Sequence, residues 1–224
     1  MKVEPRCDVL LRGRRLFFGG GEEMLYLIGG SPCSGKSTIA ANLADRYQLI
    51  PIKLDDLVED FTREARKDGA PISTRREKRT SDQIWLREPV AMAEEEWAFY
   101  EEIFPYLLQY LVENQDKPLM IEGAGLLPQL VSSLALELAY LCITPSADFQ
   151  IEQYAKREWV PYVLQDSSNP QLAFDNWMKR DILFAQRCRT EAEKFSYPHL
   201  LTDGSRTIEE MAEQAADIFG LSNC

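Results

Sequence analysis

Short apolar runs alternate with amphipathic or alanine-rich stretches along most of this chain. The run at 24–28 is followed by two glycines and is typical of a buried parallel strand, and the alanine-rich stretch at 37–47 predicts the first helix. Further strands are expected at 50–54, 118–121, 138–143 and 199–202, and further helices at 56–68, 146–164, 171–195 and 207–219. Five successive strand-to-helix steps predict an α/β fold with a parallel sheet between layers of helices.

The segment between the second and third strands is long and mostly helical in pattern. Residues 69–81 combine glycine, proline, hydroxyl and basic residues and are expected to form a loop. A helical stretch follows at 82–115, with interruptions expected at Pro89 and Pro105. Its aromatic residues, Tyr100 among them, are expected to pack in the core. The pattern therefore predicts a helical insert over about 56–115 and a second helical unit over about 146–195.

The first 23 residues differ from the rest of the chain. They carry five basic and four acidic side chains, and three consecutive glycines precede the first predicted strand. We expect residues 1–23 to be a flexible extension, or to lie upstream of the true start, and residues 24–224 to form one domain. A length of 224 residues suits one α/β domain with a modest insert.

Composition excludes several classes of protein. The formal net charge of −11 argues against a general nucleic-acid binder, because the phosphate backbone repels an acidic chain. No apolar run approaches the roughly 18 residues of a membrane span. The five cysteines are widely spaced and include no CxxC pair, which predicts reduced thiols in the cytoplasm rather than disulfides or a zinc site. A histidine-based mechanism would rest on His199, the one histidine.

Residues 30–37 match the phosphate-binding motif G-x-x-x-x-G-K-[ST]. Glycines let the backbone fold tightly around phosphates, and the loop N–H groups and the start of the next helix attract an anion. Lys36 is expected to reach the β- and γ-phosphates, and Ser37 to offer its hydroxyl to Mg²⁺. A chance match is the alternative, but the motif follows a predicted strand and opens a predicted helix. The expected nucleotide-binding residues are Gly30, Ser31, Pro32, Cys33, Ser34, Gly35, Lys36, Ser37 and Thr38.

The chain lacks the N/T-K-x-D segment of GTPases and the signature of transport ATPases. It resembles the P-loop nucleoside, nucleotide and small-molecule kinases of the adenylate, shikimate and gluconate kinase type over residues 24–220. Ile121-Glu122-Gly123 followed by Leu126-Leu127-Pro128 is similar to the corresponding stretch of 2-phosphoglycerate kinase-like proteins. The resemblance implies a three-layer α/β/α fold, a five-stranded parallel sheet in the order of nucleoside monophosphate kinases, a helical lid, and the use of ATP and Mg²⁺.

Two acidic positions follow predicted strands. The resemblance places Asp55 opposite the acceptor hydroxyl, where a carboxylate can accept the proton or hold a metal-bound water. One acid of the pair Asp55-Asp56 can instead cap the next helix, and we expect Asp56 to be that cap. Glu122 is expected to help Ser37 hold Mg²⁺ or, with Gly123, to contact the acceptor. An acidic loop residue in solvent is the alternative for Glu122.

Basic residues are concentrated in the insert. Residues 63–87 contain eight basic and four acidic side chains, which favours an anionic acceptor, with Arg63 and Arg87 as the chosen contacts. A solvated loop face is the alternative.

The resemblance also implies lid arginines over the transferring phosphate. Arg157 is the first choice and Arg180 and Arg187 follow, although Arg180 could belong to an exposed salt-bridged face. Asp203-Gly204 would lie beside the adenine, or form only a turn.

These residues together predict an enzyme that transfers the γ-phosphoryl group of ATP to a small, anionic, hydroxylated acceptor. Lys36, Asp55 and Arg157 are its predicted catalytic residues. The alternative is a nucleotide-binding regulatory or partner-binding module with little transferase activity. A kinase that modifies an antibiotic or a nucleotide sugar is a third possibility. The expected partners are ATP and the acceptor, with no nucleic acid and no membrane, in a monomer or homodimer.

Overall fold

A five-stranded sheet of parallel strands forms the centre of the computed structural model, which describes residues 8–11, 14–17, 25–114, 117–134 and 138–221. Its strand order is β4-β5-β3-β6-β7, and each neighbouring pair is parallel. The strands are β3 (Leu25–Gly30), β4 (Ile50–Lys53), β5 (Leu119–Glu122), β6 (Leu138–Pro145) and β7 (His199–Thr202). The predicted five-stranded parallel sheet is confirmed, with strand bounds within two residues of those expected.

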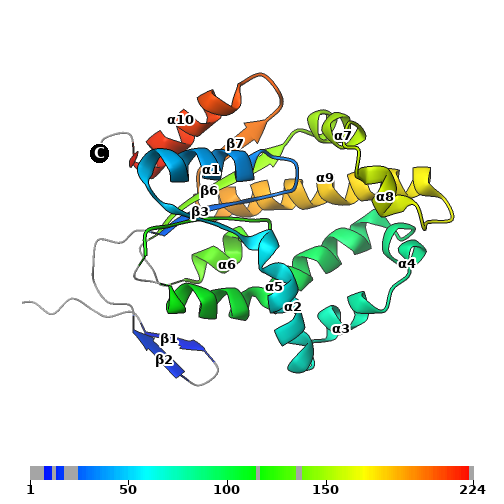
Figure 1. The fold of residues 1–224 in the computed structure, drawn as a ribbon, viewed down its shortest axis with the longest axis horizontal. Coiled ribbons are helices and arrows are strands. Elements are labelled where there is room, and N and C mark those ends of the chain that lie inside the picture. Colours follow the sequence, from blue (N-terminus) through cyan, green and yellow to red (C-terminus); the bar gives the residue numbers. More distant parts are fainter. Residues whose placement is uncertain (1–7, 12–13, 18–24, 115–116, 135–137, 222–224) are drawn as a thin grey trace, which may run out of the picture.

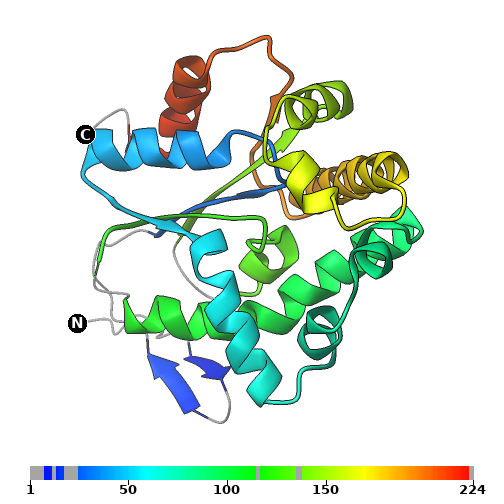
Figure 2. The same ribbon diagram turned by 45° about the vertical axis from the view of Figure 1, so that its right-hand side comes forward.

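Helices cover both faces of this sheet (Figures 1 and 2). The pair α1 (Lys36–Tyr47) and α10 (Ile208–Phe219) covers one face, and α5 (Pro89–Glu113), α6 (Pro128–Ser132) and α9 (Pro170–Lys194) cover the other. Successive residues of β3 supply the two cores, because strand side chains alternate in direction. Leu27 is buried in the core under α5 and α9, whereas Ile28 is buried in the core under α1 and α10.

The remaining helices follow the carboxyl ends of β4 and β6 in the chain. The insert contains α2 (Val58–Lys67), α3 (Pro71–Glu77) and α4 (Ser81–Trp85) before α5. The region after β6 contains α7 (Ala147–Ala155) and α8 (Val160–Leu164) before α9. Helical units are therefore present over both predicted ranges, about 56–115 and about 146–195. Among the described helices, none combines the length and the apolar character that crossing a membrane requires.

Two expectations for the insert were wrong. Residues 69–81 contain α3, because the Glu102 carboxylate accepts hydrogen bonds from the N–H groups of Ile72 and Ser73 at 2.9 and 2.7 Å and so caps the helix from α5. This tertiary contact has no local sequence signature. Pro105 lies inside α5 without ending it, whereas Pro89 begins that helix as expected. Nine buried side chains anchor α5, and this packing outweighs the local cost of Pro105.

A small two-stranded antiparallel sheet precedes β3 in the chain. It pairs β1 (Asp8–Leu11) with β2 (Arg14–Phe17) and is separate from the five-stranded sheet. The rest of the predicted extension over 1–23 lies outside the described residues, and its flexibility stays a prediction.

Candidate functional site

The turn between β3 and α1 has the backbone of a phosphate cradle. Gly30, Cys33 and Gly35 all have positive φ values, of 123°, 64° and 79°. Gly35 is the N-cap of α1 and no side chain caps the helix there, so the first N–H groups of α1 lack an intrahelical partner. A helix start of this kind attracts anions.

Close packing fixes the position of this turn against the sheet. A Cβ atom on Gly30 would lie 1.9 Å from the Ile143 carbonyl oxygen of β6, so only glycine fits there. The Thr202 hydroxyl at the end of β7 donates a 2.7 Å hydrogen bond to the Ser34 carbonyl oxygen. Two neighbouring strands therefore hold the turn in place.

Lys36 is the first residue of α1 and is only 6% exposed. Its ammonium group donates to the Ser31 carbonyl oxygen at 3.4 Å, a long contact that leaves further donors on Nζ. The buried hydroxyls of Ser31 and Ser34 have no hydrogen-bond partner among the described residues. The turn thus contains an ammonium donor and two hydroxyls without a hydrogen-bond partner among the described residues.

A cavity of about 450 Å³ opens above the turn. It brings together most of the predicted cradle, Asp55 and Arg157, together with four residues that the sequence did not single out as site residues. Its lining consists of Pro32, Cys33, Ser34, Gly35, Lys36, Ser37, Thr38, Asp55, Tyr100, Ala124, Tyr154, Arg157 and Trp159.

Glu122 lies at the end of β5, beside the cradle, and is only 2% exposed. Neither of its carboxylate oxygens makes a hydrogen bond of ordinary geometry among the described residues. Burial raises the pKa of Glu122, while the nearby Lys36 ammonium and Ser37 hydroxyl oppose that rise. The alternative of a solvent-exposed loop acid was therefore wrong, and the oxygens of Glu122 and Ser37 lie near each other.

Asp55 lies in the short 3₁₀ turn η1 (Leu54–Asp56) between β4 and α2. It is exposed and lines the cavity. A Cβ atom on Gly123 would lie 2.4 Å from the Cβ of Leu54, so the glycine lets the end of β5 approach η1. The predicted cap role of Asp56 was wrong, because Leu57 is the N-cap of α2 and no side chain caps it.

Arg157 reaches the cradle from the segment between α7 and α8. One of its Nη atoms lies 3.4 Å from the Cys33 sulfur, and its guanidinium lies 4.6 Å from the ring centre of Tyr154. Burial raises the pKa of Cys33, and the Arg157 charge opposes this. Of the three predicted lid arginines, Arg157 is the one that lines this cavity.

Tyr100 is a cavity residue that sequence pattern alone assigned to the core. It is 8% exposed and packs in the α5 core, yet it also lines the cavity. Burial raises its pKa, and the carboxylates of Glu96 and Asp55 raise it further. The aromatic pattern of α5 predicted burial correctly, but only the fold reveals which ring borders the site.

Several predicted site residues lie away from the cavity lining. Arg63 forms an ion pair with Asp60 on α2. Arg187 on α9 packs its guanidinium 4.0 Å from the ring centre of Trp97. Asp203 accepts hydrogen bonds from the backbone N–H and hydroxyl of Ser205, which is the turn expected as the alternative. Gly204 belongs to the same turn, with a φ of 85°.

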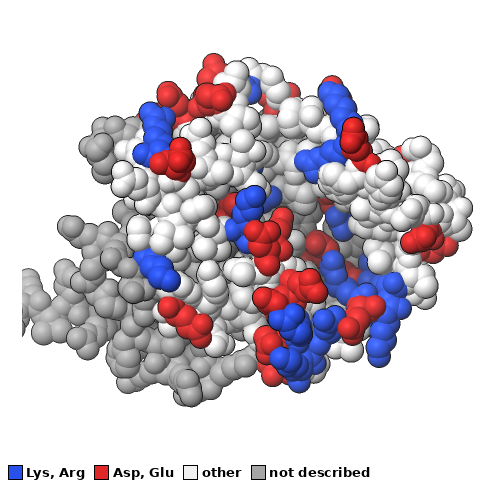
Figure 3. Space-filling model, viewed as in Figure 1, with Lys and Arg blue, Asp and Glu red and all other residues white. Residues whose placement is uncertain are grey.

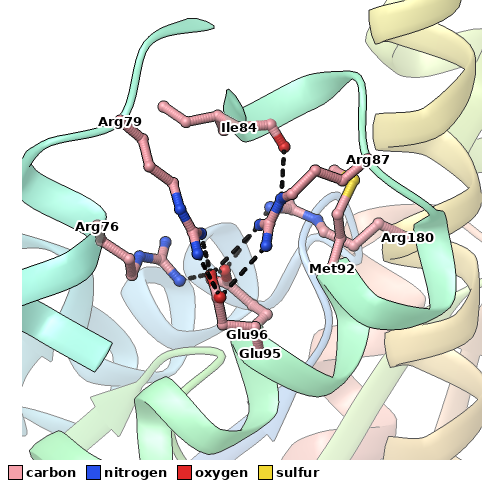
Figure 4. Close-up of a pocket in the computed structure, with 8 residues that line it drawn as sticks. All are labelled: Arg76, Arg79, Ile84, Arg87, Met92, Glu95, Glu96 and Arg180. Atoms are coloured by element: carbon pink, nitrogen blue, oxygen red, sulfur yellow. Dashed lines mark hydrogen bonds and ion pairs between the residues drawn. The ribbon is translucent and has the colours of Figure 1, made fainter. Parts of the chain in front are cut away.

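Arg87 and Arg180 belong to an arginine–glutamate cluster beside the cavity. Four guanidinium groups point toward two carboxylates of α5 around a small cavity of about 60 Å³ (Figure 4). Arg87 contacts Glu95 at 3.2 Å, and Arg180 lies 3.7 Å from Glu96 and 2.6 Å from Asp181. Arg180 is therefore salt-bridged but half-buried, rather than on an exposed face. The cluster consists of Arg76, Arg79, Arg87, Arg180, Glu95 and Glu96.

Basic side chains also gather on the adjoining surface over α3 and α4 (Figure 3). A cavity of about 410 Å³ there is lined by four cationic side chains and one glutamine, with no acidic group in its lining. Two of its cations, Arg79 and Arg87, also pair with Glu95. The lining residues are Arg75, Lys78, Arg79, Gln83 and Arg87.

The cluster makes a prediction about stability at low pH. Burial opposes the ionisation of Glu95, but hydrogen bonds from Arg79 and Arg87 lower its pKa from 4.5 to about 2. Because the folded-state pKa is depressed, this stabilisation is full above pH 4.5 and is lost as the pH falls toward 2. Between pH 6 and pH 3 we expect the free energy of unfolding to fall by about 2 kcal/mol more in the wild type than in Glu95→Gln. Urea unfolding at both pH values measures this, and equal losses would contradict it.

Comparison with known proteins does not identify a family. No family model matches the chain, and no curated protein matches it in sequence. A solved structure of an uncharacterized protein from Eubacterium ventriosum is 9% identical, with a TM-score of 0.40 over 88% of this chain and 98% of the other. A protein from Chloroflexus aurantiacus described as a "putative kinase" is 12% identical, with a TM-score of 0.42 over the same shares. These values are too low to support an argument, so function is inferred from the site.

Proposed function

We propose that this protein is an ATP- and Mg²⁺-dependent phosphotransferase that acts on a small, anionic, hydroxylated molecule. The observation that carries the proposal is one cavity that combines a G-x-x-x-x-G-K-S turn with an exposed carboxylate and an arginine. These groups supply a triphosphate cradle, a proton acceptor and a cation for the transferring group. We also propose that the order β4-β5-β3-β6-β7 is the order found in nucleoside monophosphate kinases.

The cradle would hold the triphosphate by charge and by backbone donors. The positive-φ turn and the uncapped start of α1 present N–H groups, and Lys36 adds a buried positive charge. Because Lys36 is confined by packing, its charge is positioned before the nucleotide arrives. Pre-positioned charge of this kind stabilises a phosphoryl-transfer transition state more effectively than mobile solvent does.

Glu122 and Ser37 suit a magnesium ion. The described residues contain no group of three or more histidine, cysteine or acidic side chains that could hold a metal without help. Magnesium commonly binds one or two protein oxygens and completes its shell with water and substrate phosphates. The unpartnered oxygens of Glu122 and the nearby Ser37 hydroxyl fit that need. Bound there, the ion would neutralise phosphate charge.

Asp55 and Arg157 would act at the reacting atoms. Asp55 is exposed to the cavity and can orient the acceptor hydroxyl and accept its proton. Arg157, which reaches Cys33 in the turn, can neutralise charge on the γ-phosphoryl oxygens. An exposed Asp55 in the cavity favours an enzyme over the regulatory module, for which a distant or buried acid would be expected.

The anionic character of the acceptor is supported by the basic cavity over α3 and α4. Four cationic groups line it in a chain whose formal net charge is −11, and two of them, Arg79 and Arg87, also pair with Glu95. Arg87 is among them, whereas Arg63 does not line this cavity and pairs with Asp60. The cytoplasmic location and the monomeric or homodimeric state stay predictions.

The test is an ATP-consumption screen against phosphorylated sugars, nucleosides, nucleotides and sugar acids. With the acceptor that it identifies, Asp55→Asn is expected to lower kcat by about 10²–10⁴-fold, because the proton acceptor is lost. Its affinity for MgATP should remain within a few-fold of the wild type. Asp56→Asn is the matched control, since Asp56 is also exposed but does not line the cavity. Equal effects of the two substitutions would remove Asp55 from the mechanism.

A further inference from the structure

Trp159 is an exposed indole at a ligand cavity. The chain has four tryptophans, and all of them are described. Trp97 and Trp177 are 1% and 6% exposed and Trp85 is half-buried, whereas Trp159 is 45% exposed. It nevertheless lines the same cavity as the phosphate cradle. A large aromatic surface left open at such a place is available to a ligand.

Neighbouring rings hold this indole in place. Its ring centre lies 6.0 Å from that of Tyr154, nearly edge-on at 75°, and 5.9 Å from that of Trp177. Trp177 in turn stacks on Trp85 at 4.6 Å. These four rings come from α4, α7, α9 and the start of α8. The cluster fixes the orientation of Trp159, so little freedom remains to be lost when a ligand stacks on it.

Arg157 connects the indole to the phosphate cradle. Its guanidinium lies 5.5 Å from the ring centre of Trp159, and one of its Nη atoms lies 3.4 Å from the Cys33 sulfur in the turn. The indole is therefore separated from the cradle by a single arginine side chain.

We propose that Trp159 is the platform on which the nucleobase of the bound nucleotide stacks. The inference rests on the proposed function, because it assumes a nucleotide in the cradle. Stacking on an aromatic ring tolerates every base, since each base has a π face. The site should therefore accept several nucleoside triphosphates, and purines should bind more tightly than pyrimidines because their stacking area is larger.

The test compares MgATP with magnesium tripolyphosphate, which has the phosphates but no base. Isothermal titration should show that Trp159→Ala raises the Kd of MgATP by roughly 10- to 100-fold. The Kd of tripolyphosphate should stay unchanged, and Trp159→Tyr should restore most of the MgATP affinity. Tyr162→Ala is the matched control, because Tyr162 is a 71% exposed aromatic residue of α8 that does not line the cavity.

The outcomes separate this inference from the proposed function. Equal weakening of both ligands by Trp159→Ala, or an unchanged Kd for MgATP, would overturn the stacking role while leaving the phosphate cradle intact. The same loss in Tyr162→Ala would show a general effect on the helical unit and would also overturn it. Failure of the wild type to bind either ligand would overturn the proposed function, and the platform with it.

Discussion

Replacement of Lys36 by alanine is expected to lower phosphoryl transfer by roughly 10²–10³-fold and to weaken MgATP binding. Lys36 is 6% exposed, and its hydrogen bond to the Ser31 carbonyl oxygen is a long one of 3.4 Å. Its charge lies at the cradle, where it also opposes the rise in the pKa of the nearby buried Glu122. Removing it takes away a cation that is in position before the transition state forms, and water cannot replace that cation inside the turn.

Steady-state kinetics and titration with MgATP measure both parts of this prediction. Lys156→Ala is a suitable control, because Lys156 is an exposed lysine near the same cavity that pairs with Glu152 and is absent from the lining. The two variants should differ strongly, although each removes one lysine charge. Retained turnover in Lys36→Ala would show that the cradle is not used for phosphoryl transfer.

The second large effect is expected from Gly30→Ala, which should cost about 4 kcal/mol of stability or prevent folding. The added Cβ would lie 1.9 Å from the Ile143 carbonyl oxygen, and the φ of 123° disfavours any side chain. Backbone cannot move away cheaply here, because β3 and β6 are hydrogen-bonded neighbours in the centre of the sheet.

Gly69→Ala is the matched control for Gly30→Ala. Gly69 also has a positive φ, of 80°, but a Cβ there would have no atom within 4 Å. It should therefore cost only the conformational penalty, about 1–2 kcal/mol. Urea unfolding of both variants separates the steric effect from the backbone effect. Similar losses of stability would contradict the close approach of Gly30 to β6.

Residues 30–38 were predictable from the sequence because their chemistry is local. The spacing of Gly30, Gly35 and Lys36 defines the turn, and a strand before it with a helix after it supplies the required setting. The strands were equally accessible, since β3, β5 and most of β6 are buried on both faces and carry continuous apolar runs. Asp55 could be predicted as a site residue because it follows the second predicted strand.

The rest of the site could not be predicted, because it depends on contacts between residues that are far apart in the sequence. The helix α3 exists where a loop was expected because Glu102, some 30 residues away, caps it. Tyr100 and Trp159 were recognisable as aromatic residues, but only the fold brings α5 and the start of α8 to the cavity beside the cradle. Arg87 and Arg180 were predicted as contacts for an anion because of their charge. In the structure Arg87 pairs with Glu95, and Arg180 pairs with Glu96 and Asp181.

The most direct test of the central claim is the transfer of ³²P from [γ-³²P]ATP to the acceptor panel, with wild type and Lys36→Ala side by side. We expect a labelled product from at least one anionic acceptor, formed only with Mg²⁺ and reduced by roughly 10²-fold or more in Lys36→Ala. Labelled product from Lys36→Ala at the wild-type rate would contradict the claim. So would a wild-type protein that neither binds MgATP nor labels any acceptor.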